Sequence, residues 1–277
     1  MDKKLRIIAV VPIYFPSVNL VENIKSYFDY VDLIFIINNS VEVLPELKNI
    51  FFSSNKIILH NPSFNLGLSK SYNFALNFAL NNNFDYLLIM DQDSKFISNF
   101  IWEDLIYLHE NKNIALISAA SSLDRSDYLN DYDNSYYERK IIMSSGSFLS
   151  IEAARVIGYF DELFFIDEID HDYSLRCYHK NFINISSYLI HLNHMVGEEQ
   201  IVKFPFSLIK KQIILHKPFR YYHIFRNSRI MISRYMIKEP IFVWNKFIYL
   251  LKLLLKIILF YPKKYSYFSY IFKSLKK

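Results

Sequence analysis

Cysteine and glycine are scarce in this chain of 277 residues. The single cysteine, Cys177, excludes an internal disulfide framework and a cysteine-rich metal site. It fits a reducing, cytosolic environment. The four glycines, Gly67, Gly146, Gly158 and Gly197, are each expected to mark a special backbone position. The N-terminal residues lead into a short apolar strand, so we expect no signal peptide.

Acidic residues are almost absent from the C-terminal part of the chain. Residues 203–277 contain 17 Lys and Arg and one acid, Glu239, whereas residues 1–202 contain 15 Lys and Arg and 26 Asp and Glu. This asymmetry indicates an anionic partner, which is a membrane surface, a nucleic acid or a phosphate-bearing substrate. Nucleic acid is disfavoured, because the acidic body would repel it and the tail has no recognised nucleic-acid motif.

Short apolar runs alternate with amphipathic segments through the first 120 residues. We expect buried strands at residues 5–11, 33–37, 57–59, 86–90 and 114–119, with helices at about 20–30, 69–80 and 99–110. Pro12 is expected to end the first strand. Elements that alternate at this spacing predict βαβ units and a mostly parallel α/β sheet.

The second half of the chain changes in character. Residues 121–140 are polar and predict a loop at the ligand edge, where long loops often carry function. Further elements are expected as a strand at 141–150, a helix at 151–157, a strand at 184–190, a helix at 204–236 and a long apolar helix at 241–261. We therefore divide the chain into an α/β domain, 1–202, and a helical basic region, 203–277.

Two carboxylates, Asp91 and Asp93, directly follow the apolar run at 86–90. They alternate along an extended backbone, so both are able to face the same side. Open α/β sheets bind ligands at the carboxyl ends of their strands. Paired carboxylates suit Mg²⁺ or Mn²⁺ held together with substrate phosphates. This segment alone leaves two interpretations open, a metal–phosphate site and a solvated turn.

Six acids lie within the twelve residues from Asp161 to Asp172. Such a density of charge requires compensation by a cation or by an arginine such as Arg176. The apolar residues beside these acids favour a raised carboxylate pKa, in the range of a general base. The alternative is a helix start, where acids stabilise the dipole. That alternative stays open for Asp170 and is favoured for Asp161 and Asp172.

Two further positions each have two interpretations. His194 is a candidate third metal ligand beside the two aspartates, since imidazole suits Mn²⁺-type sites, and an ordinary histidine is the alternative. Arg226 and Arg229, three residues apart in a predicted helix, are candidates to bind a diphosphate. A solvated basic face is the alternative for this pair.

The apolar helix expected at 241–261 contains Lys246, Lys252 and Lys256. Three lysines are costly in a membrane-spanning helix. We therefore predict an interfacial helix, with its lysines toward the headgroups and its aromatic residues as anchors. This prediction places the protein in the cytoplasm, peripheral on the inner face of the cell membrane. The alternative is a packed helix at a homodimer interface.

Several short motifs occur in a characteristic order. They are Val11-Pro12-Ile13-Tyr14, Asn38-Asn39-Ser40, Asn65-Leu66-Gly67-Leu68-Ser69 with Asn73, Asp91-Gln92-Asp93-Ser94, Ser145-Gly146-Ser147, residues 165–172 with Arg176, His194-x-x-Gly197, and Arg220-Tyr221-Tyr222 with Arg226-Asn227. Together they resemble the family 2 glycosyltransferases of the GT-A fold, most closely their rhamnosyltransferase-like branch, over nearly the whole chain. Two positions depart from the pattern, because Asn38 stands where Asp is usual and Asp172 where Glu is common.

The resemblance implies an inverting, metal-dependent glycosyltransferase that requires Mg²⁺ or Mn²⁺. It implies that residues 1–202 are the catalytic domain, with a nucleotide-sugar half, about 1–120, and an acceptor half, about 121–202, and that the loop at 121–140 closes over the donor. It implies Asp170 as the catalytic base and Asp93, Asp91 and His194 as the metal ligands. The implied donor-binding residues are Pro12, Tyr14, Asn38, Asn39, Asn65, Gly67, Ser69, Asn73, Gln92 and Arg226. The implied acceptor-side residues are Ser145, Gly146, Ser147, Asp167, Asp172 and Arg176.

The implied reaction moves a sugar from a nucleotide-sugar, with dTDP-rhamnose as the expected donor, to a hydroxyl of a growing surface polysaccharide. The expected acceptor is a glycan or lipid-linked glycan at the cytoplasmic membrane surface. One alternative is another donor, such as UDP-galactofuranose or a UDP-hexose. A nucleotidyl or sugar-phosphate transferase would need a Gly- and Arg-rich phosphate loop that the first strand lacks. A non-catalytic membrane-associated scaffold is disfavoured by the intact set of acids.

Overall fold

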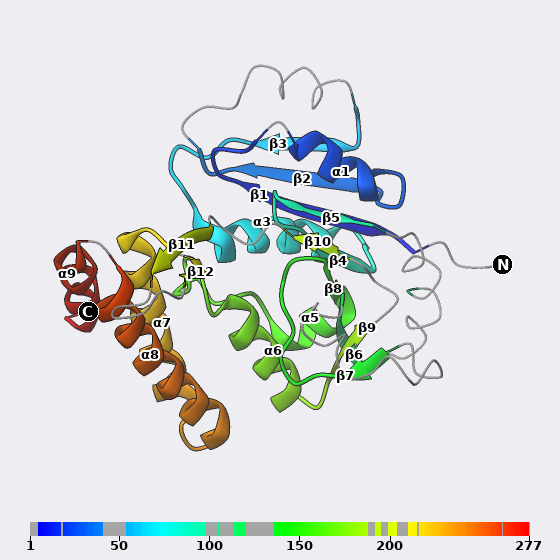
Figure 1. Ribbon diagram of the computed structural model, residues 1–277. Coiled ribbons are helices and arrows are strands. Elements are labelled where there is room, and N and C mark those ends of the chain that lie inside the picture. The colour runs from blue at the N-terminus through cyan, green and yellow to red at the C-terminus, as the bar shows by residue number, and fades with distance from the viewer. Residues whose placement is uncertain are drawn as a thin grey trace, which may run out of the picture. The chain divides into compact units, whose positions relative to one another are not determined.

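The computed structural model in Figure 1 describes most of the chain. The described residues are 5–17, 19–40, 54–97, 105, 113–119, 136–187, 192–194, 199–203, 210–214, 216–261 and 263–276. The helix expected at 99–110, except for residue 105, and most of the loop expected at 121–140 lie outside them. The chain divides into two compact units, the first made of residues 1–165 and 169–195, the second of residues 166–168 and 196–277.

An eight-stranded sheet forms the centre of the first unit, in the order β3-β2-β1-β4-β8-β6-β9-β7. The strands are β1 (Ile7–Ile13), β2 (Leu33–Asn38), β3 (Ile57–His60), β4 (Tyr86–Ile89), β6 (Ile114–Ala119), β7 (Tyr136–Glu138), β8 (Ser147–Ser150) and β9 (Ile183–Ser187). β1 pairs in parallel with both β2 and β4, β2 pairs in parallel with β3, and β6 pairs in parallel with β9. β8 is antiparallel to both β4 and β6, and β7 to β9. The predicted α/β class with a mostly parallel sheet is confirmed.

β1 continues through Pro12, so the prediction that this proline ends the strand is wrong. β1 pairs with β4 only from Ile7 to Val10, whereas its pairing with β2 continues to Ile13. In the described part of the sheet, β1 therefore has one neighbouring strand beyond Val10. A proline lacks an N–H group and is tolerated where one side of a strand is unpaired.

Helices cover both faces of the sheet (Figure 1). α1 (Leu20–Phe28) buries its apolar side in one core with the odd-numbered residues of β1. α3 (Gly67–Asn81) packs on the opposite face, where its rings Phe74 and Phe78 lie 5.4 and 5.1 Å from Phe35 of β2. α5 (Ile151–Ile157) and α6 (Ile169–His179) follow in the second half of the unit. The ring of Phe160 contacts Tyr72 of α3 and Tyr173 of α6, so it joins these two helices.

Two short strands outside the main sheet were not expected from the sequence. β5 (Ser94–Phe96) and β10 (Leu192–His194) pair antiparallel, with His194 opposite Ser94. The strand expected at 141–150 is also shorter than predicted, because only β8 at its end is extended. Strands of three residues carry too little periodicity to be recognised in a sequence.

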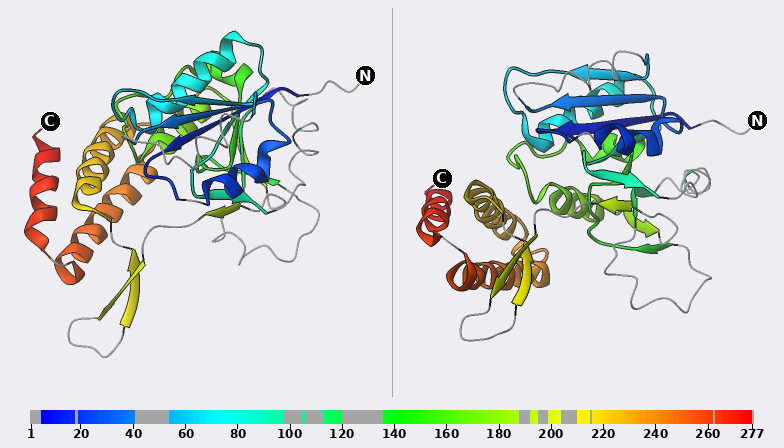
Figure 2. Two further views of the ribbon diagram at one scale, coloured as in Figure 1. Left: turned by 90° about the horizontal axis from the view of Figure 1, so that it is seen from above. Right: turned by 45° about the horizontal axis from the view of Figure 1, so that its top comes forward.

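The second unit contains a hairpin and three helices. The hairpin joins β11 (Glu199–Lys203) and β12 (Lys210–Ile214), and Figure 2 shows it standing apart from α7 (Pro218–Tyr235), α8 (Pro240–Phe260) and α9 (Lys264–Leu275). The prediction of a helix across 204–236 is therefore wrong for β12. α7 begins only at Pro218, and a proline is well suited to the first helical position.

The three helices of the second unit share their own apolar core. Side chains from all three helices are buried together. They are Tyr221, Ile224 and Phe225 of α7, Leu253 and Ile257 of α8, Tyr261 directly after α8, and Tyr267 and Ile271 of α9. The apolar helix predicted at 241–261 is confirmed as α8. Of the helices in the described residues, none is both long and apolar enough to cross a membrane.

Candidate active site

The carboxyl ends of β1, β2 and β4 meet at one edge of the parallel part of the sheet. Asp91, Gln92 and Asp93 form a half-buried turn there, closed by the Ser94 N–H donating to the Asp91 carbonyl at 3.2 Å. The Gln92 amide exchanges two hydrogen bonds with the backbone of Tyr14, at 2.7 Å to its N–H and 3.2 Å to its carbonyl. The predicted donor-side residues Tyr14 and Gln92 therefore hold the aspartate turn against the end of β1.

Serines fix the other side of the same turn. The Ser145 hydroxyl accepts from the Asp91 N–H at 3.2 Å and donates to the Ser94 hydroxyl at 2.9 Å. The Gly146 N–H donates to the carbonyl of Ile89 at 2.9 Å. β10 runs beside this point, with the backbone of His194 opposite Ser94. The structure thus brings together the aspartate motif, the Ser145-Gly146-Ser147 motif and the backbone of His194.

The asparagines at the end of β2 organise the loop that leads into α3. The Asn39 side chain accepts from the Leu66 N–H at 2.8 Å and donates to the Ser71 hydroxyl at 3.2 Å. The Asn38 side chain donates to the Asn61 side chain at 3.0 Å and accepts from the Ser40 N–H at 3.0 Å. Amide side chains at these positions both donate and accept, which an Asp at position 38 would not do.

The start of α3 packs against the segment that leads into the acidic cluster. Gly67 has a φ of +75°, and a Cβ atom at this position would lie 2.5 Å from Cδ2 of Phe165. The Leu68 N–H donates to the Phe165 carbonyl at 2.8 Å, and the Ser69 hydroxyl donates to the Phe164 carbonyl. Because only hydrogen fits at position 67, the glycine allows this close approach of two backbones.

Four of the six acids between 161 and 172 are paired with cations. Asp172, 0% exposed, accepts from the Arg176 guanidinium at 2.9 Å, and Glu162 lies 3.8 Å from Lys70. In the second unit, Asp167 pairs with Arg220 at 2.8 Å and Glu168 with Lys246 at 2.7 Å. The predicted need for compensating cations at this cluster is therefore met by basic side chains, with Arg176 among them.

Asp170 differs from these four acids, since it forms no salt bridge with a residue that the structure describes. It lies half-buried in the first turn of α6, and its carboxylate accepts from the His171 N–H at 2.9 Å. One oxygen is engaged in this way, and a carboxylate has further lone pairs for a second partner. The predicted role of Asp170 as the catalytic base stays a prediction.

A buried tyrosine links the aspartate turn to Asp170. Tyr72 of α3 is 0% exposed, and its burial raises the pKa of its phenol well above its usual range. The negative charge of Asp91, and to a smaller extent that of Asp170, raises this pKa further. The charges of Asp91 and Asp170 thus both act on the phenol of Tyr72.

The donors at the turn suit a divalent metal ion chemically. Asp91 and Asp93 offer hard carboxylate oxygens at the ligand edge, as Mg²⁺ and Mn²⁺ prefer. Among the described residues, no three His, Cys, Asp or Glu side chains are grouped closely enough to hold a metal. For His194 the description is limited to the backbone, so its role as a third ligand stays a prediction.

Two predicted site residues belong to the second unit. Arg226 lies half-buried in α7 and donates to the Asn227 side chain at 3.1 Å. Asp167 is held by Arg220. The predicted donor role of Arg226 and the predicted acceptor-side roles of Asp167, Asp172 and Arg176 stay predictions.

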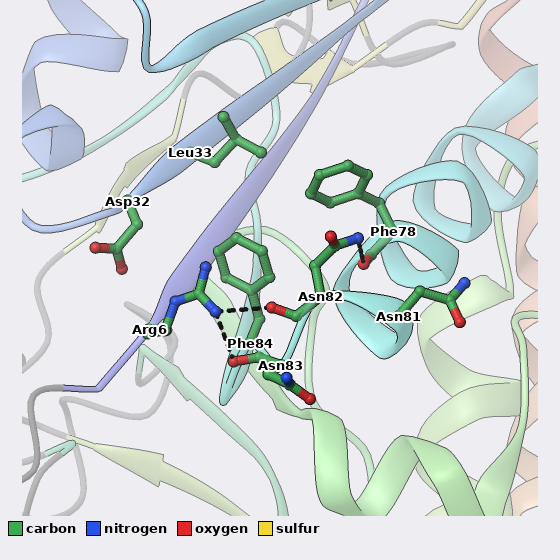
Figure 3. A pocket seen from close by; sticks show the side chains of 8 residues that line it. All are labelled: Arg6, Asp32, Leu33, Phe78, Asn81, Asn82, Asn83 and Phe84. Atoms are coloured by element: carbon green, nitrogen blue, oxygen red, sulfur yellow. Dashed lines mark hydrogen bonds between the residues drawn. The ribbon is translucent and has the colours of Figure 1, made fainter.

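A surface pocket of about 460 Å³ lies at the opposite edge of the sheet, at the amino ends of β1, β2 and β4 (Figure 3). The Arg6 guanidinium donates to the carbonyls of Asn82 and Asn83 at 2.7 and 3.2 Å and lies 4.5 Å from the centre of the Phe84 ring. The Asp32 carboxylate accepts from the Ile7 N–H at 2.8 Å. These polar groups hold backbone segments together. The lining of this pocket therefore has a structural role, unlike the carboxylates at the opposite edge of the sheet.

Comparisons with solved structures define the class. The mannosyltransferase PcManGT from Pyrobaculum calidifontis, in complex with GDP-Man and Mn²⁺, superposes with a TM-score of 0.56 at 13% identity over 82% of this chain and 64% of that one. GalNAc-T7 with UDP, GalNAc and Mn²⁺ superposes with a TM-score of 0.58 at 9% identity over 70% of this chain and 44% of that one. The chain has the GT-A fold of these glycosyltransferases, as the sequence predicts.

The chain is also similar in sequence to a characterised glycosyltransferase. The chain is 26% identical over 187 residues to the dTDP-rhamnosyl transferase RfbF of Shigella flexneri, which covers 61% of this chain and 61% of the relative. The chain thus matches less than two thirds of the length of that relative. No family model matches the chain.

Asn73 offers a sharp test of how α3 holds the segment before the acidic cluster. Its amide donates to the Phe160 carbonyl at 2.9 Å and accepts from the Phe160 N–H at 2.8 Å. We expect Asn73→Asp to lower the free energy of unfolding at neutral pH by about 1–3 kcal/mol, because the donor is lost and the carboxylate faces a carbonyl. This environment should raise the pKa of the new carboxyl in the folded protein, so the deficit should shrink as pH falls.

Urea unfolding at pH 5 and pH 7.5 measures the effect. Asn77→Asp is the matched control one turn further along α3, because its exposed Oδ1 accepts from the Tyr159 hydroxyl at 2.7 Å and an aspartate keeps that acceptor. Equal losses in the two variants would contradict a specific role for the Asn73 amide.

Proposed function

We propose that this chain is an inverting glycosyltransferase that transfers a sugar from a nucleotide-sugar to an acceptor hydroxyl. dTDP-rhamnose is the proposed donor, supported by the similarity to the dTDP-rhamnosyl transferase. The UDP and GalNAc bound to one structural neighbour and the GDP-Man bound to another support the broader class of donor. The proposed acceptor is a glycan or lipid-linked glycan.

One observation carries this proposal. Two kinds of carboxylate come to the carboxyl edge of the sheet, because the start of α3 at that edge donates hydrogen bonds to the carbonyls of Phe164 and Phe165, shortly before Asp170. One of them belongs to the aspartate turn at the carboxyl edge of the sheet, and the other begins a helix and has no salt bridge within the described residues. A transferase requires this combination, which is a place for a diphosphate beside a carboxylate able to accept a proton.

The proposed reaction is a single in-line displacement. The acceptor oxygen attacks the anomeric carbon, and the bond from that carbon to the diphosphate oxygen breaks with its electron pair leaving on the nucleoside diphosphate. Asp170 accepts the proton of the attacking hydroxyl. The helix N-terminus at Asp170 and the His171 N–H hold this carboxylate in a fixed orientation before the proton arrives. Displacement from the opposite side inverts the anomeric centre.

Asp93, Asp91 and His194 are the residues proposed to hold Mg²⁺ or Mn²⁺ with the donor diphosphate. When bound, a divalent cation neutralises negative charge that develops on the leaving diphosphate. The chain's own contribution is to orient the carboxylates, through Gln92 on Tyr14 and through Ser145 on the Asp91 N–H. Arg226 is proposed as a further positive charge for the diphosphate.

The basic second unit is proposed to bring the enzyme to an anionic membrane surface on the cytoplasmic side. Trp244, Leu251 and Leu255 are exposed along one side of α8, and Lys252 is exposed among them. Glu239, the sole acid among residues 203–277, is buried. An apolar face with cations and no exposed acid suits anionic lipid headgroups.

The base assignment predicts the behaviour of Asp170→Asn. We expect kcat to fall by about 10²–10⁴-fold with donor affinity unchanged, because an amide cannot accept the proton. The assay is transfer or donor hydrolysis over several nucleotide-sugars, with donor binding measured by calorimetry. Asp161→Asn is the matched control, since its Oδ1 accepts from the Leu163 N–H at 2.9 Å and an amide oxygen preserves that bond. Near-normal transfer by folded Asp170→Asn would rule out the assignment.

Metal dependence is tested by chelation. We expect EDTA to abolish transfer and added Mn²⁺ or Mg²⁺ to restore it, because the diphosphate charge would otherwise be uncompensated. Binding of dTDP should tighten when the metal is added to the wild type and should not respond to metal in Asp93→Asn. Calorimetric titration with and without metal measures this difference. Full activity in EDTA would show that the metal role is wrong.

Membrane binding is tested on the exposed side of α8. We expect Trp244→Gln/Leu251→Gln/Leu255→Gln to lower the partition onto phosphatidylglycerol-containing vesicles by about 10- to 100-fold, because apolar area no longer leaves water. Co-sedimentation with vesicles measures the partition. The double variant Ile58→Gln/Val156→Gln is the control, because it removes exposed apolar groups from the first unit. Unchanged vesicle binding with a change from dimer to monomer would instead assign this face to a homodimer interface.

A further inference from the structure

The three residues before α6 have an unusual backbone. Asp167 and Glu168 have φ angles of +64° and +69°, so two consecutive residues with side chains adopt the left-handed conformation. L-residues avoid this region, and a pair of them persists only where the surroundings fix it. Residues 166–168 are also the part of the chain that groups with the second unit, although Phe165 and Ile169 on either side belong to the first.

Three side chains of α7 and α8 hold this segment. The Lys246 ammonium of α8 donates to both carboxylate oxygens of Glu168, at 2.7 and 2.8 Å. The Arg220 guanidinium of α7 donates to both oxygens of Asp167, at 2.8 and 3.3 Å. The Asn227 amide of α7 donates to the carbonyls of Ile166 and Asp167, at 2.7 and 3.1 Å. We call Arg220, Asn227 and Lys246 the 166–168 clamp.

The ion pair between Lys246 of the clamp and Glu168 is buried. Their exposed fractions are 8% and 6%, so water screens this pair little. A lysine on an apolar helix would otherwise extend to solvent, as Lys252 does on the same helix. Instead Lys246 lies on the side of α8 that faces Glu168. The prediction that this lysine faces lipid headgroups is therefore wrong.

The position of Asp170 depends on this segment through the covalent chain. α6 begins at Ile169, one residue after Glu168, so the φ angles of Asp167 and Glu168 set the direction in which the first turn starts. Asp170 is the second residue of that turn. A change of the two left-handed residues to an ordinary conformation would turn the Asp170 carboxylate away from its present position.

We propose that Lys246 is a positioning residue for Asp170, which it orients by fixing Glu168 in the left-handed conformation. The inference rests on the proposed function in one respect, which is that Asp170 is the base. It assigns to the C-terminal helices a part in the transfer reaction that is separate from membrane binding. It also means that one side of α8 faces Glu168, whereas the opposite side, which includes Trp244, is exposed.

The test replaces Lys246 with methionine, which keeps the length of the side chain and removes its charge. We expect Lys246→Met to lower kcat by about 10- to 100-fold, because small displacements of a reacting group have effects of this size. The KM for the donor should be unchanged, since the residues of the aspartate turn are not altered. Lys246→Arg should restore most of the activity, because a guanidinium can also pair with the Glu168 carboxylate. Lys238→Met is the matched control, an exposed lysine two residues before α8.

A second readout does not depend on activity. Cys177 is the sole cysteine of the chain, lies in α6 and is 0% exposed, and burial raises the pKa of its thiol to about 12. A thiol reagent therefore reacts with the native protein only when α6 opens. We expect faster labelling of Cys177 in Lys246→Met than in the wild type or Lys238→Met, with a weak dependence on urea that marks local opening.

Each outcome decides between the alternatives. A fall in kcat at constant donor KM, together with faster labelling, supports the positioning role. Faster labelling with unchanged kcat would show that the ion pair is only structural and would overturn the proposal, as would unchanged labelling whatever the activity. An inactive wild type whose Lys246→Met variant labels faster would overturn the proposed function while leaving the clamp as the anchor of α6. If Lys246→Met does not fold, Lys246→Met/Glu168→Gln, which buries no uncompensated charge, is tested against the same expectations.

Discussion

Compensation of negative charge between residues 161 and 172 is the constraint on which the rest of the structure depends. Six carboxylates in twelve residues repel one another unless cations are brought to them. Arg176 comes from the same helix, Lys70 from α3, and Arg220 and Lys246 from the second unit. Removing one partner of a buried pair such as Glu168 and Lys246 costs about 3–5 kcal/mol, which is a large part of the stability of a domain. The cluster thus joins three separate parts of the sequence.

The same pairing separates structural acids from a chemical one. A carboxylate held by a guanidinium or ammonium keeps its charge and its place, and is poorly suited to take up a proton. Asp172 and Asp167 are held in this way, and Asp170 is not, within the described residues. One short segment therefore contains both the anchors of a helix start and the residue proposed as the base. The GT-A fold supplies the aspartate turn opposite it, at the carboxyl edge of the sheet.

Much of the first unit is predictable from the sequence because its strands are continuous apolar runs. β1, β2 and β4 are buried on both faces, so their hydrophobicity marks them clearly. β12 was predicted as helix because its mixture of lysines and isoleucines carries no clear period over five residues. The end of β1 was misplaced because the effect of Pro12 depends on which neighbour the strand has at that residue. Neighbours are a property of the assembled sheet and not of the local sequence.

The motifs predict which residues belong to the candidate site. They do not predict which groups those residues contact. No pattern in the chain indicates that the Gln92 amide pairs with the backbone of Tyr14, or that Tyr72 lies near both Asp91 and Asp170. Lys246 gives a clear example, since a lysine in an apolar helix suggests a headgroup contact whereas its partner lies 78 positions earlier. Such long-range pairs are set by tertiary packing. The roles assigned from motifs are therefore best tested through these contacts.

The separation of Glu168 from Lys246 has a consequence for the order of folding during synthesis. At about 5–20 residues per second, the ribosome needs roughly 4–16 s to add the 78 residues between them. The strands of the sheet, α3 and α6 are all made before Lys246 is added, while the carboxylate of Glu168 remains without its lysine. The left-handed turn before α6 cannot be fixed until α8 has emerged. The last step in forming the active site would then be the arrival of a helix from the far end of the chain, and a nascent chain that pauses before α8 should be compact yet inactive.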